Sequence, residues 1–353
     1  MGRMVKQKQA AGKKPHKGLK VFLVLLILFV VCCLIAVPFA LQTIPVKEFD
    51  TSLSDFYCNW MSHIPDDVLI KNLVIPGSHD SGTVTMPSIG CTQNRHIQDQ
   101  VKAGIRYFDI RAAKQGDDLV IFHSILRGVR FEPIAQGLYD FIVANPSEFL
   151  ILDFQYFENS QQMIHDMLER IGLADLAVVN DTDLPDYDFV DGLTVGDMRG
   201  KVLIVWGADS DVDYAFRRNN NLCTVKNCVL TSPFYILLHG MQSQDVIDNI
   251  LPLYYNRYKE WNKGLFVLQC QITFGPNLYQ REASHKDNMT AYVNSIASDP
   301  EKLMYINIVM REYADDYMEK INSILRLNIA KGFVEESDTE YVQTTLPPQV
   351  ATQ

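Results

Sequence analysis

The sequence predicts an α/β fold, an irregular TIM-barrel-like (β/α) barrel preceded by one N-terminal transmembrane helix. Three observations lead to this prediction. Short apolar runs recur along the chain, helical patterns lie between them, and residues 21–41 carry no charge. Apolar runs without alternating polar residues are typical of strands that are covered on both faces, as in parallel sheets. Seven such runs approach the eight strands of a complete barrel.

Each predicted strand is followed by polar residues or a turn. The strands are expected at 72–77, 105–111, 119–123, 149–155, 201–207, 265–271 and 304–310. Helices are expected at Glu132–Ala144, Ser160–Gly172 and Tyr313–Asn328. The first stops before Asn145-Pro146, the second begins with a serine cap and closes on glycine, and the third has apolar residues three and four positions apart.

Composition divides the chain into five segments. They are a basic leader at 1–20, a transmembrane segment at 21–41, a linker and lead-in at 42–67, a barrel at 68–332 and a tail at 333–353. The tail is polar and contains prolines, so we expect it to be disordered.

The segment 21–41 is 21 uncharged residues long, against about 20 that are needed to cross a bilayer. Basic residues precede it and acidic residues follow it. The positive-inside rule then predicts a single-pass membrane protein with a cytoplasmic N-terminus and a luminal or extracellular body. A cleaved signal peptide is the alternative, although its apolar region would usually be about 7–15 residues and "AVPFAL" is a poor cleavage site.

The charge of the chain is unevenly distributed. Residues 1–20 hold seven Lys and Arg residues and no acid, so the remaining 25 basic residues face all 42 acidic ones and the body has a net charge of −17. A body this acidic repels nucleic acid, which excludes a nucleic-acid partner. No Cys/His spacing resembles a zinc site, and no metal or other cofactor is expected.

A body that crosses the membrane enters an oxidising compartment. The cysteines outside the apolar segment are odd in number: Cys58, Cys91, Cys223, Cys228 and Cys270. Cys223 with Cys228 and Cys58 with Cys91 are possible pairs that leave one thiol. The sequons at Asn180 and Asn288 permit glycosylation.

Polar side chains follow the first four predicted strands, and a parallel barrel forms its active site at that end. These residues are His79, Asp80, Asp109, Arg111, His123, Asp153 and Gln155. Asp109 and Arg111 are two positions apart and therefore lie on the same side of a strand. One histidine, or one Asp–Arg pair, is usually structural. The convergence of all of them on one rim indicates an active site.

This set of groups suits cleavage of a phosphodiester. Two imidazoles with a pKa near 6.5 act as base and acid at neutral pH. A guanidinium holds two phosphate oxygens and stabilises the charge that develops on them. Neighbouring carboxylates orient the imidazoles.

Four motifs carry a resemblance to a known family. "LVIPGSHDSGT", "QVKAGIRYFDIR", "FHS" and "NPSEFLILDF" resemble, in order and spacing, the X domain of phosphatidylinositol-specific phospholipases C, especially bacterial enzymes and small eukaryotic proteins that consist of that domain. The strong match covers residues 59–157 and a weaker one continues to about residue 328. The resemblance implies a TIM-like barrel that cleaves phosphatidylinositol, or a glycosylated form of it, by internal attack of the inositol 2-hydroxyl.

The resemblance also implies roles for individual residues. His79 corresponds to the general base that deprotonates the 2-hydroxyl. His123 corresponds to the general acid that protonates the diacylglycerol oxygen, with Asp80 as its carboxylate partner. Glu312, after the last strand, corresponds to the acid that orients the base.

The family also shows what to expect at the phosphate. Arg111 stands where bacterial enzymes have arginine and calcium-dependent animal enzymes have a metal-binding aspartate, so the resemblance implies metal-independent catalysis. Asp109 occupies the neighbouring acidic position. We expect Asp153, Gln155 and Trp206 to contact the substrate.

The sequence departs from the family pattern at three positions. Ser124 replaces a glycine after His123, Gln155 replaces a charged residue, and Glu312 replaces an aspartate. Two other functions therefore remain as alternatives. One is a metal-dependent barrel like glycerophosphodiester phosphodiesterases or sphingomyelinase D, and the other is an inactive surface protein that binds lipid head groups. For the leading hypothesis, the membrane helix would hold a lipid substrate at high effective concentration.

Overall fold

A computed structural model describes residues 17–218 and 242–346, except for positions 51, 54 and 274. The strands are β1 Ile75–Ser78, β2 Tyr107–Gln115, β3 Asp118–His123, β4 Leu126–Arg130, β5 Leu150–Glu158, β6 Val202–Trp206, β7 Ala215–Arg217, β8 Val267–Gln269 and β9 Ile308–Arg311. The helices before β6 are α1 Lys17–Ala40, α2 Phe56–Asn59, η1 Trp60–His63, α3 Ile97–Gln100, α4 Glu132–Ala144, α5 Gln161–Ile171, α6 Asp186–Gly192 and α7 Val195–Met198. Those after β7 are α9 Ser243–Asn249, α10 Leu251–Trp261, α11 Leu278–Ser295, η2 Ile296–Ser298, α12 Pro300–Tyr305, α13 Glu319–Ala330 and α14 Thr339–Thr345.

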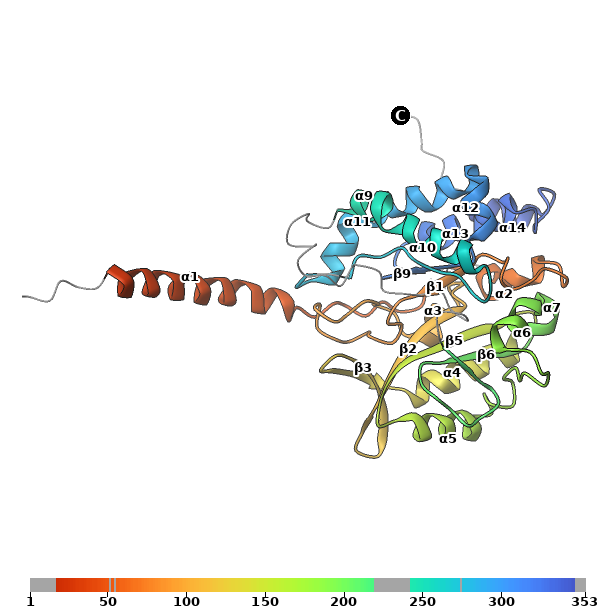
Figure 1. The fold of residues 1–353 in the computed structure, drawn as a ribbon, viewed down its shortest axis with the longest axis horizontal. Helices are drawn as coiled ribbons and strands as arrows, with labels where there is room; N and C mark the ends of the chain where they lie inside the picture. Colours follow the sequence, from red (N-terminus) through yellow and green to blue (C-terminus); the bar gives the residue numbers. More distant parts are fainter. Residues whose placement is uncertain (1–16, 51, 54, 219–241, 274, 347–353) are drawn as a thin grey trace, which may run out of the picture.

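The core of the molecule is a curled parallel sheet in the order β7-β6-β5-β2-β1-β9-β8. Helices α4 and α5 lie on one side of the molecule, and α9 to α13 lie on the other (Figure 1). Among the described residues, β7 and β8 do not pair, so the sheet is an open part of a barrel. This arrangement confirms the predicted TIM-like α/β fold and its irregularity.

Both faces of the sheet are buried, which explains the apolar runs. On β9, Ile308 and Met310 belong to one hydrophobic cluster with the other strands. Val309 points to the opposite face and packs in a second cluster with side chains of α10 and α13, including Tyr254 and Ile324. Successive strand residues face opposite sides, so a strand between two apolar layers shows no polar alternation.

The run at 119–123 is a strand, but its predicted parallel direction is wrong. Strand β3 is antiparallel to β2 and continues into the antiparallel strand β4. The turn between β2 and β3 contains Gly116 with φ +64°, in the left-handed region that favours glycine. The two residues between β2 and β3 permit a hairpin, whereas a connection between parallel strands needs about a dozen or more residues. Strands β4 and β7 were not expected from the sequence.

The helix predictions hold in part. Helix α4 has the predicted bounds, and α5 ends at Gly172 with φ +93°. Ser160 does not cap α5, since its hydroxyl donates to the carbonyl of Ala112 at 2.7 Å. Helix α13 begins at Glu319 rather than Tyr313, because Tyr313 has φ +43°, outside the helical region.

The predicted disorder of the tail is wrong for residues 333–346. Helix α14 lies in this segment, and the Asp338 side chain caps it by accepting from the Tyr341 amide at 3.0 Å. The Tyr341 side chain is fully buried, and its hydroxyl donates to the carbonyl of Leu325 at 3.1 Å. One buried aromatic residue and one cap are therefore enough to fix a segment whose composition is polar.

The predicted lead-in is part of the core rather than a linker. Trp60 is fully buried, and its indole donates to the Gly104 carbonyl at 3.0 Å. The buried Arg106 guanidinium donates to the carbonyls of Tyr57 and Cys58 and pairs with Glu148 at 2.8 Å. This buried ion pair joins the lead-in to β2 and to the segment before β5.

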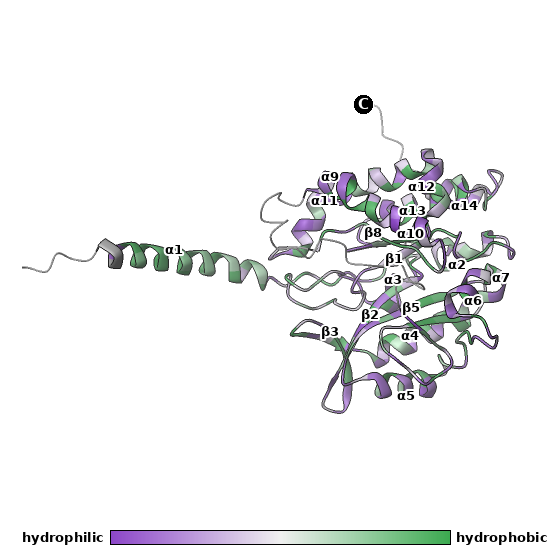
Figure 2. Ribbon diagram, in the orientation of Figure 1, coloured by the Kyte–Doolittle hydropathy of each residue, from purple (hydrophilic) through white to green (hydrophobic). Residues whose placement is uncertain are grey.

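Helix α1 projects from the body and is apolar along most of its length (Figure 2). An 18-residue window within Lys20–Ala40 has a mean hydropathy of 3.3, and none of that window is buried in the body. Within the described part of the chain, this helix is long and apolar enough to cross a membrane, a test that a signal sequence also passes.

The described cysteines of the body are all free thiols. Cys58 lies near the Lys102 carbonyl, whereas the buried Cys91 donates to the carbonyl of Gln93 at 3.1 Å. The predicted Cys58–Cys91 pair is therefore wrong. Cys223 and Cys228 lie outside the described residues.

Removing the carboxylate of the buried ion pair tests its importance. The variant Glu148→Ala should lower the free energy of unfolding by about 3–5 kcal/mol, because Arg106 stays charged and buried without a partner. Thermal unfolding of the full chain in detergent measures the loss.

The matched control is Glu158→Ala, which removes an exposed ion pair with Arg127 at 2.6 Å. It should cost no more than about 1 kcal/mol. Similar losses in the two variants would contradict the structural importance of the buried pair.

Candidate active site

His79 follows β1 directly and is held between β9 and the next loop. Its amide donates to the carbonyl of Arg311 at 3.0 Å, and its carbonyl accepts from the Thr92 hydroxyl and the Gln93 amide group. The imidazole is buried. Its Nδ1 lies 3.4 Å from Oε1 of Glu312, and its Nε2 faces the opposite direction, toward two aspartates.

Asp80 lies at the centre of the site. Its Oδ1 is 2.5 Å from Nε of Arg111, and its Oδ2 lies 3.6 Å from Nε2 of His79 and 3.4 Å from Nε2 of His123. One buried carboxylate thus contacts a guanidinium and both imidazoles. The backbone of Asp80 has φ +43°, which an aspartate tolerates better than most residues and which turns the chain sharply after His79.

Asp109 and Arg111 project from the same side of β2, as their spacing predicts. Nη2 of Arg111 lies 3.1 Å from Oδ2 of Asp109, and the same oxygen accepts from the Asp80 amide at 3.3 Å. The guanidinium also lies over the Tyr156 ring, 5.0 Å from its centroid. The side chain of Arg111 remains 15% exposed, so the held cation is accessible from the rim.

His123 reaches the site by a route that differs from the predicted one. It ends β3, in the β2–β3–β4 hairpin, rather than a parallel strand of the barrel. The hairpin folds back so that this imidazole meets Asp80. Ser124 follows with φ +56°, the left-handed region in which a glycine is unstrained. This backbone conformation is compatible with the glycine that the family resemblance leads us to expect at this position.

Glu312 lies directly after β9 and is fully buried. Its Oε1 accepts from the Thr273 hydroxyl at 2.5 Å and is the atom that contacts His79. The buried Lys320 donates to the carbonyls of Glu312 and Tyr313 and so fixes the turn that carries Glu312. Sequence reasoning did not find Thr273 or Lys320, since neither lies next to a recognisable motif.

Two of the three predicted substrate contacts, Asp153 and Gln155, are hydrogen-bonded to each other. Asp153 is paired in register with Asp109 across β5 and β2, and its Oδ2 accepts from Gln155 at 3.2 Å. The same oxygen accepts from Arg218 at 2.9 Å, a residue that the sequence did not indicate because it follows a strand of only three residues.

Trp206 does not line the site, and that prediction is wrong. Its side chain is fully buried, and its ring stacks on the ring of His165 with centroids 4.2 Å apart. Trp206 is therefore a core residue between the sheet and α5.

Comparison with known proteins agrees with this geometry. The chain is 25% identical over 295 residues to a 1-phosphatidylinositol phosphodiesterase of Listeria monocytogenes, a match that covers 76% of this chain and 84% of that protein. It is 28% identical over 154 residues to the human PI-PLC X domain-containing protein 2, covering 33% of this chain and 50% of that protein. No family model matches the chain.

Solved structures show the same fold. The phosphatidylinositol-specific phospholipase C of Listeria monocytogenes has a TM-score of 0.59 at 20% identity, covering 77% of this chain and 98% of that one. A Staphylococcus aureus phosphatidylinositol-specific phospholipase C has a TM-score of 0.55 at 16% identity, covering 76% and 97%. The chain is therefore similar to phosphatidylinositol-specific phospholipases C and to PI-PLC X domain-containing proteins. The family resemblance predicted from the sequence is confirmed.

The carboxylates of the site raise the pKa of its buried imidazole and of its guanidinium. Burial lowers the pKa of His79, but Asp80, Glu312 and Asp109 outweigh burial, so its pKa is raised above the ordinary value near 6.5. Burial lowers the pKa of Arg111. The nearby carboxylates of Asp109 and Asp80 outweigh burial, so the pKa of Arg111 is raised. Arg111 therefore stays cationic at every pH of interest.

Three side chains of the site could together hold a metal ion. His79, Asp80 and Asp109 place ligand atoms within 4.8 Å of one another. Both carboxylates are already paired with Arg111, at 2.5 Å and 3.1 Å. A divalent cation between them would therefore stand beside a fixed guanidinium.

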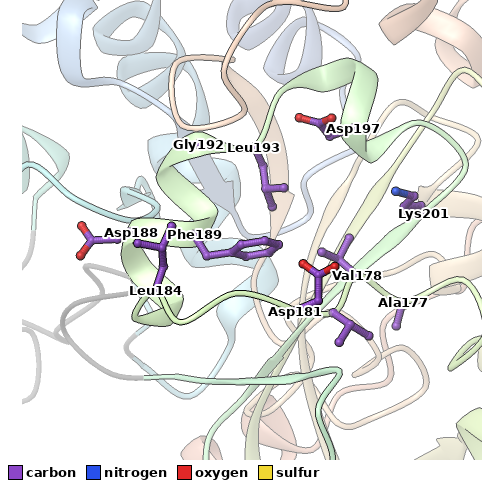
Figure 3. A pocket seen from close by; sticks show the side chains of 11 residues that line it. Ala177, Val178, Asp181, Leu184, Asp188, Phe189, Gly192, Leu193, Asp197 and Lys201 are labelled. Atoms are coloured by element: carbon purple, nitrogen blue, oxygen red, sulfur yellow. The ribbon is translucent and has the colours of Figure 1, made fainter.

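A different pocket, of about 540 Å³, lies before β6, at the opposite end of the parallel strands (Figure 3). Apolar side chains such as Leu184 and Phe189 line it, together with three aspartates and Lys201. It has no imidazole among its lining residues, so it lacks the acid–base groups of the rim.

The contact between Glu312 and His79 can be tested by titration. The variant Glu312→Gln keeps the side-chain shape but removes a charge that favours the imidazolium, so the pKa of His79 should fall. Nuclear magnetic resonance of histidine-labelled protein measures this value.

An exposed acid elsewhere supplies the control for this titration. The variant Glu336→Gln removes a charge from the segment before α14 and should leave the titration of His79 unchanged. An unchanged pKa in Glu312→Gln would show that Glu312 does not act on the imidazole.

Proposed function

We propose that this chain is a membrane-anchored phospholipase C-like phosphodiesterase that cleaves phosphatidylinositol or a glycosylated form of it. One observation carries the proposal: Asp80 brings two imidazoles and a guanidinium together around one point at the rim. The relatives named for phosphatidylinositol cleavage support the substrate class.

In the proposed reaction, the inositol 2-hydroxyl attacks phosphorus as His79 takes its proton. The bond between phosphorus and the diacylglycerol oxygen breaks, and His123 donates a proton to the leaving oxygen. The products are a cyclic inositol phosphate and diacylglycerol. His79 suits the first role because Glu312 contacts its far nitrogen and leaves Nε2 directed into the site.

Arg111 supports the reaction through charge. The phosphate carries a negative charge that spreads over its oxygens as the new bond forms. A guanidinium held by two carboxylates needs little reorganisation to stabilise that charge. Asp80 and Asp109 hold it from one side, and its exposed edge faces the rim.

The departures from the family pattern leave the proposed chemistry intact. Ser124 adopts the left-handed backbone of the glycine it replaces. Glu312 still reaches His79, although its side chain is longer than aspartate. Gln155 is neutral and hydrogen-bonded to Asp153, so it affects head-group contacts rather than proton transfer. These observations favour an enzyme over an inactive binding protein.

Removing either imidazole should abolish most turnover. The variants His79→Ala and His123→Ala should each reduce phosphatidylinositol cleavage by roughly 10²–10⁴-fold, because a positioned acid or base contributes that much. Phosphorus nuclear magnetic resonance of the products measures the rate and identifies the cyclic phosphate.

The control is His96→Ala, which removes a histidine from the residue before α3, outside the site. It should retain the wild-type rate. Equal background turnover by wild type and His79→Ala would end the enzyme proposal.

A chelator separates the arginine mechanism from a metal-dependent one. The rate of the full chain should not change in excess EDTA, because Arg111 supplies the positive charge at the phosphate. A glycerophosphodiester phosphodiesterase-like mechanism would instead lose activity in EDTA and regain it with added divalent cation, and that result would overturn the metal-independent proposal.

A further inference from the structure

We infer that α1 is a retained anchor whose end is built into the rim of the site, so that the catalytic mouth is held against the membrane that α1 spans. This inference rests on the proposed function for its substrate. Beyond the proposed function, we infer that the site takes its lipid from the bilayer that α1 spans. The rigid junction between α1 and the body fixes the orientation of the site toward that bilayer.

Ser88 is the first element of the junction. Its hydroxyl is buried and lies 2.9 Å from the carbonyl of Phe39 and 3.0 Å from that of Ala40. The amide of Ile89 donates to the Ala40 carbonyl at 3.1 Å, and the Ser88 amide donates to that of Gln42 at 2.9 Å. The last turn of α1 is thus hydrogen-bonded to the body.

The chain after α1 is also fixed. Asn277, from the segment before α11, donates to the Gln42 side chain at 2.9 Å. Thr43 forms a β-bridge with Pro87, and Ile44 is buried in the main hydrophobic cluster. No flexible spacer therefore lies between Ala40 and the core of the described structure.

This junction argues that α1 is not removed as a signal peptide. Cleavage after Ala40 would carry away the carbonyls of Phe39 and Ala40. The buried Ser88 hydroxyl would then lose its two nearest acceptors and keep only the carbonyl of Pro276, at 3.4 Å, and weakening the hydrogen bonds of a buried polar group is unfavourable. The junction is therefore complete only when α1 remains attached.

The junction loop also lies next to both histidines of the site. The loop that carries Ser88 begins at His79, and its Thr92 hydroxyl lies 3.0 Å from the His79 carbonyl. Gly90 packs against the hairpin so closely that a Cβ atom there would come within 3.1 Å of Nδ1 of His123. The end of the anchor is therefore only one loop away from both the base and the acid.

Exposed apolar side chains surround the same junction. Ile125, at the tip of the hairpin beside His123, is 88% exposed, and Ile89 in the junction loop is 44% exposed. Phe39 and Leu41 at the end of α1 are also exposed. Moving such an isoleucine from water into a bilayer is favourable. Because α1 ends beside them, the leaflet is the partner that these side chains meet.

A shallow pocket of about 330 Å³ beside Phe39 carries a cation suited to lipid phosphate. Arg281 lines it, and within the described structure its guanidinium has no acidic partner and its buried Nε has no hydrogen bond. An uncompensated cation is unexpected on a body with a net charge of −17. At the end of a membrane helix, anionic lipid head groups supply the missing charge.

The orientation follows from these contacts. Helix α1 leaves the body from the rim that carries the hairpin tip, and α6 and α7 lie at the far end of the molecule (Figure 1). A rigid junction keeps the rim on the bilayer and keeps the far end away from it. The site then reaches lipids of its own leaflet and not those of a second membrane.

The test compares lipid in the same vesicle with lipid in another vesicle. The full chain is reconstituted into vesicles with phosphatidylinositol, or into vesicles without it that are mixed with phosphatidylinositol vesicles. Wild type should cleave its own lipid at least tenfold faster. A flexible Gly/Ser insertion between Ala40 and Leu41 should raise cleavage of the second membrane severalfold, whereas the same insertion after Leu346 should not.

Equal wild-type rates on the two membranes would overturn the inference. Turnover in mixed micelles distinguishes this outcome from failure of the proposed function, because micelles present lipid in every orientation. Activity in micelles with no preference between vesicles refutes the orientation alone, and absence of activity in micelles refutes the proposed function.

Two readouts do not depend on activity. Brominated lipids should quench the added tryptophan of Ile125→Trp but not that of Leu184→Trp, which lies in the pocket at the far end (Figure 3). The intact mass of the membrane-bound chain should include α1. Absence of quenching in Ile125→Trp, or a chain that starts at Leu41, would each overturn the inference.

Discussion

The site depends on one buried carboxylate that contacts three cationic or titratable groups. Asp80 meets Arg111 at 2.5 Å and both imidazoles within 3.6 Å, although the three residues come from β2, β3 and the end of β1. A buried charge without partners would be too costly to retain, so these contacts fix the relative positions of the strand ends. The positive φ of Asp80 is part of the same constraint, because it turns the carboxylate back toward His79.

The sequence predicted this site well because each group follows a strand that its own apolar run identifies. His79, Asp109 and Arg111 were placed by a parallel-barrel argument that the structure obeys. His123 was placed correctly for the wrong reason, since the two residues between β2 and β3 allow only a hairpin. Arg218 was not indicated, because β7 is too short to show a pattern. Trp206 was assigned to the site wrongly, because a tryptophan at a strand end gives no sign of which face it occupies.

Sequence reasoning was weakest where single contacts, rather than patterns, determine structure. The segment 42–67 looks like a linker, yet Trp60 and the Arg106–Glu148 pair place it in the core. The tail looks disordered, yet Tyr341 and the Asp338 cap order α14. Such contacts join positions far apart in the chain. Propensity and periodicity describe only near neighbours, so neither could reveal them.

The acidic body gives the junction at Ser88 its physical importance. A net charge of −17 repels an anionic leaflet, so diffusion alone would keep this site away from its proposed substrate. A flexible tether would raise the local concentration of lipid at the site. It would not prevent electrostatic repulsion from rotating the acidic body, and the site with it, away from the bilayer. A helix end hydrogen-bonded to the loop that begins at His79 removes this freedom. In the proposed orientation, the exposed isoleucines and Arg281 would meet apolar and phosphate groups of the membrane, so the contacts that hold α1 to the body would also orient the proposed chemistry.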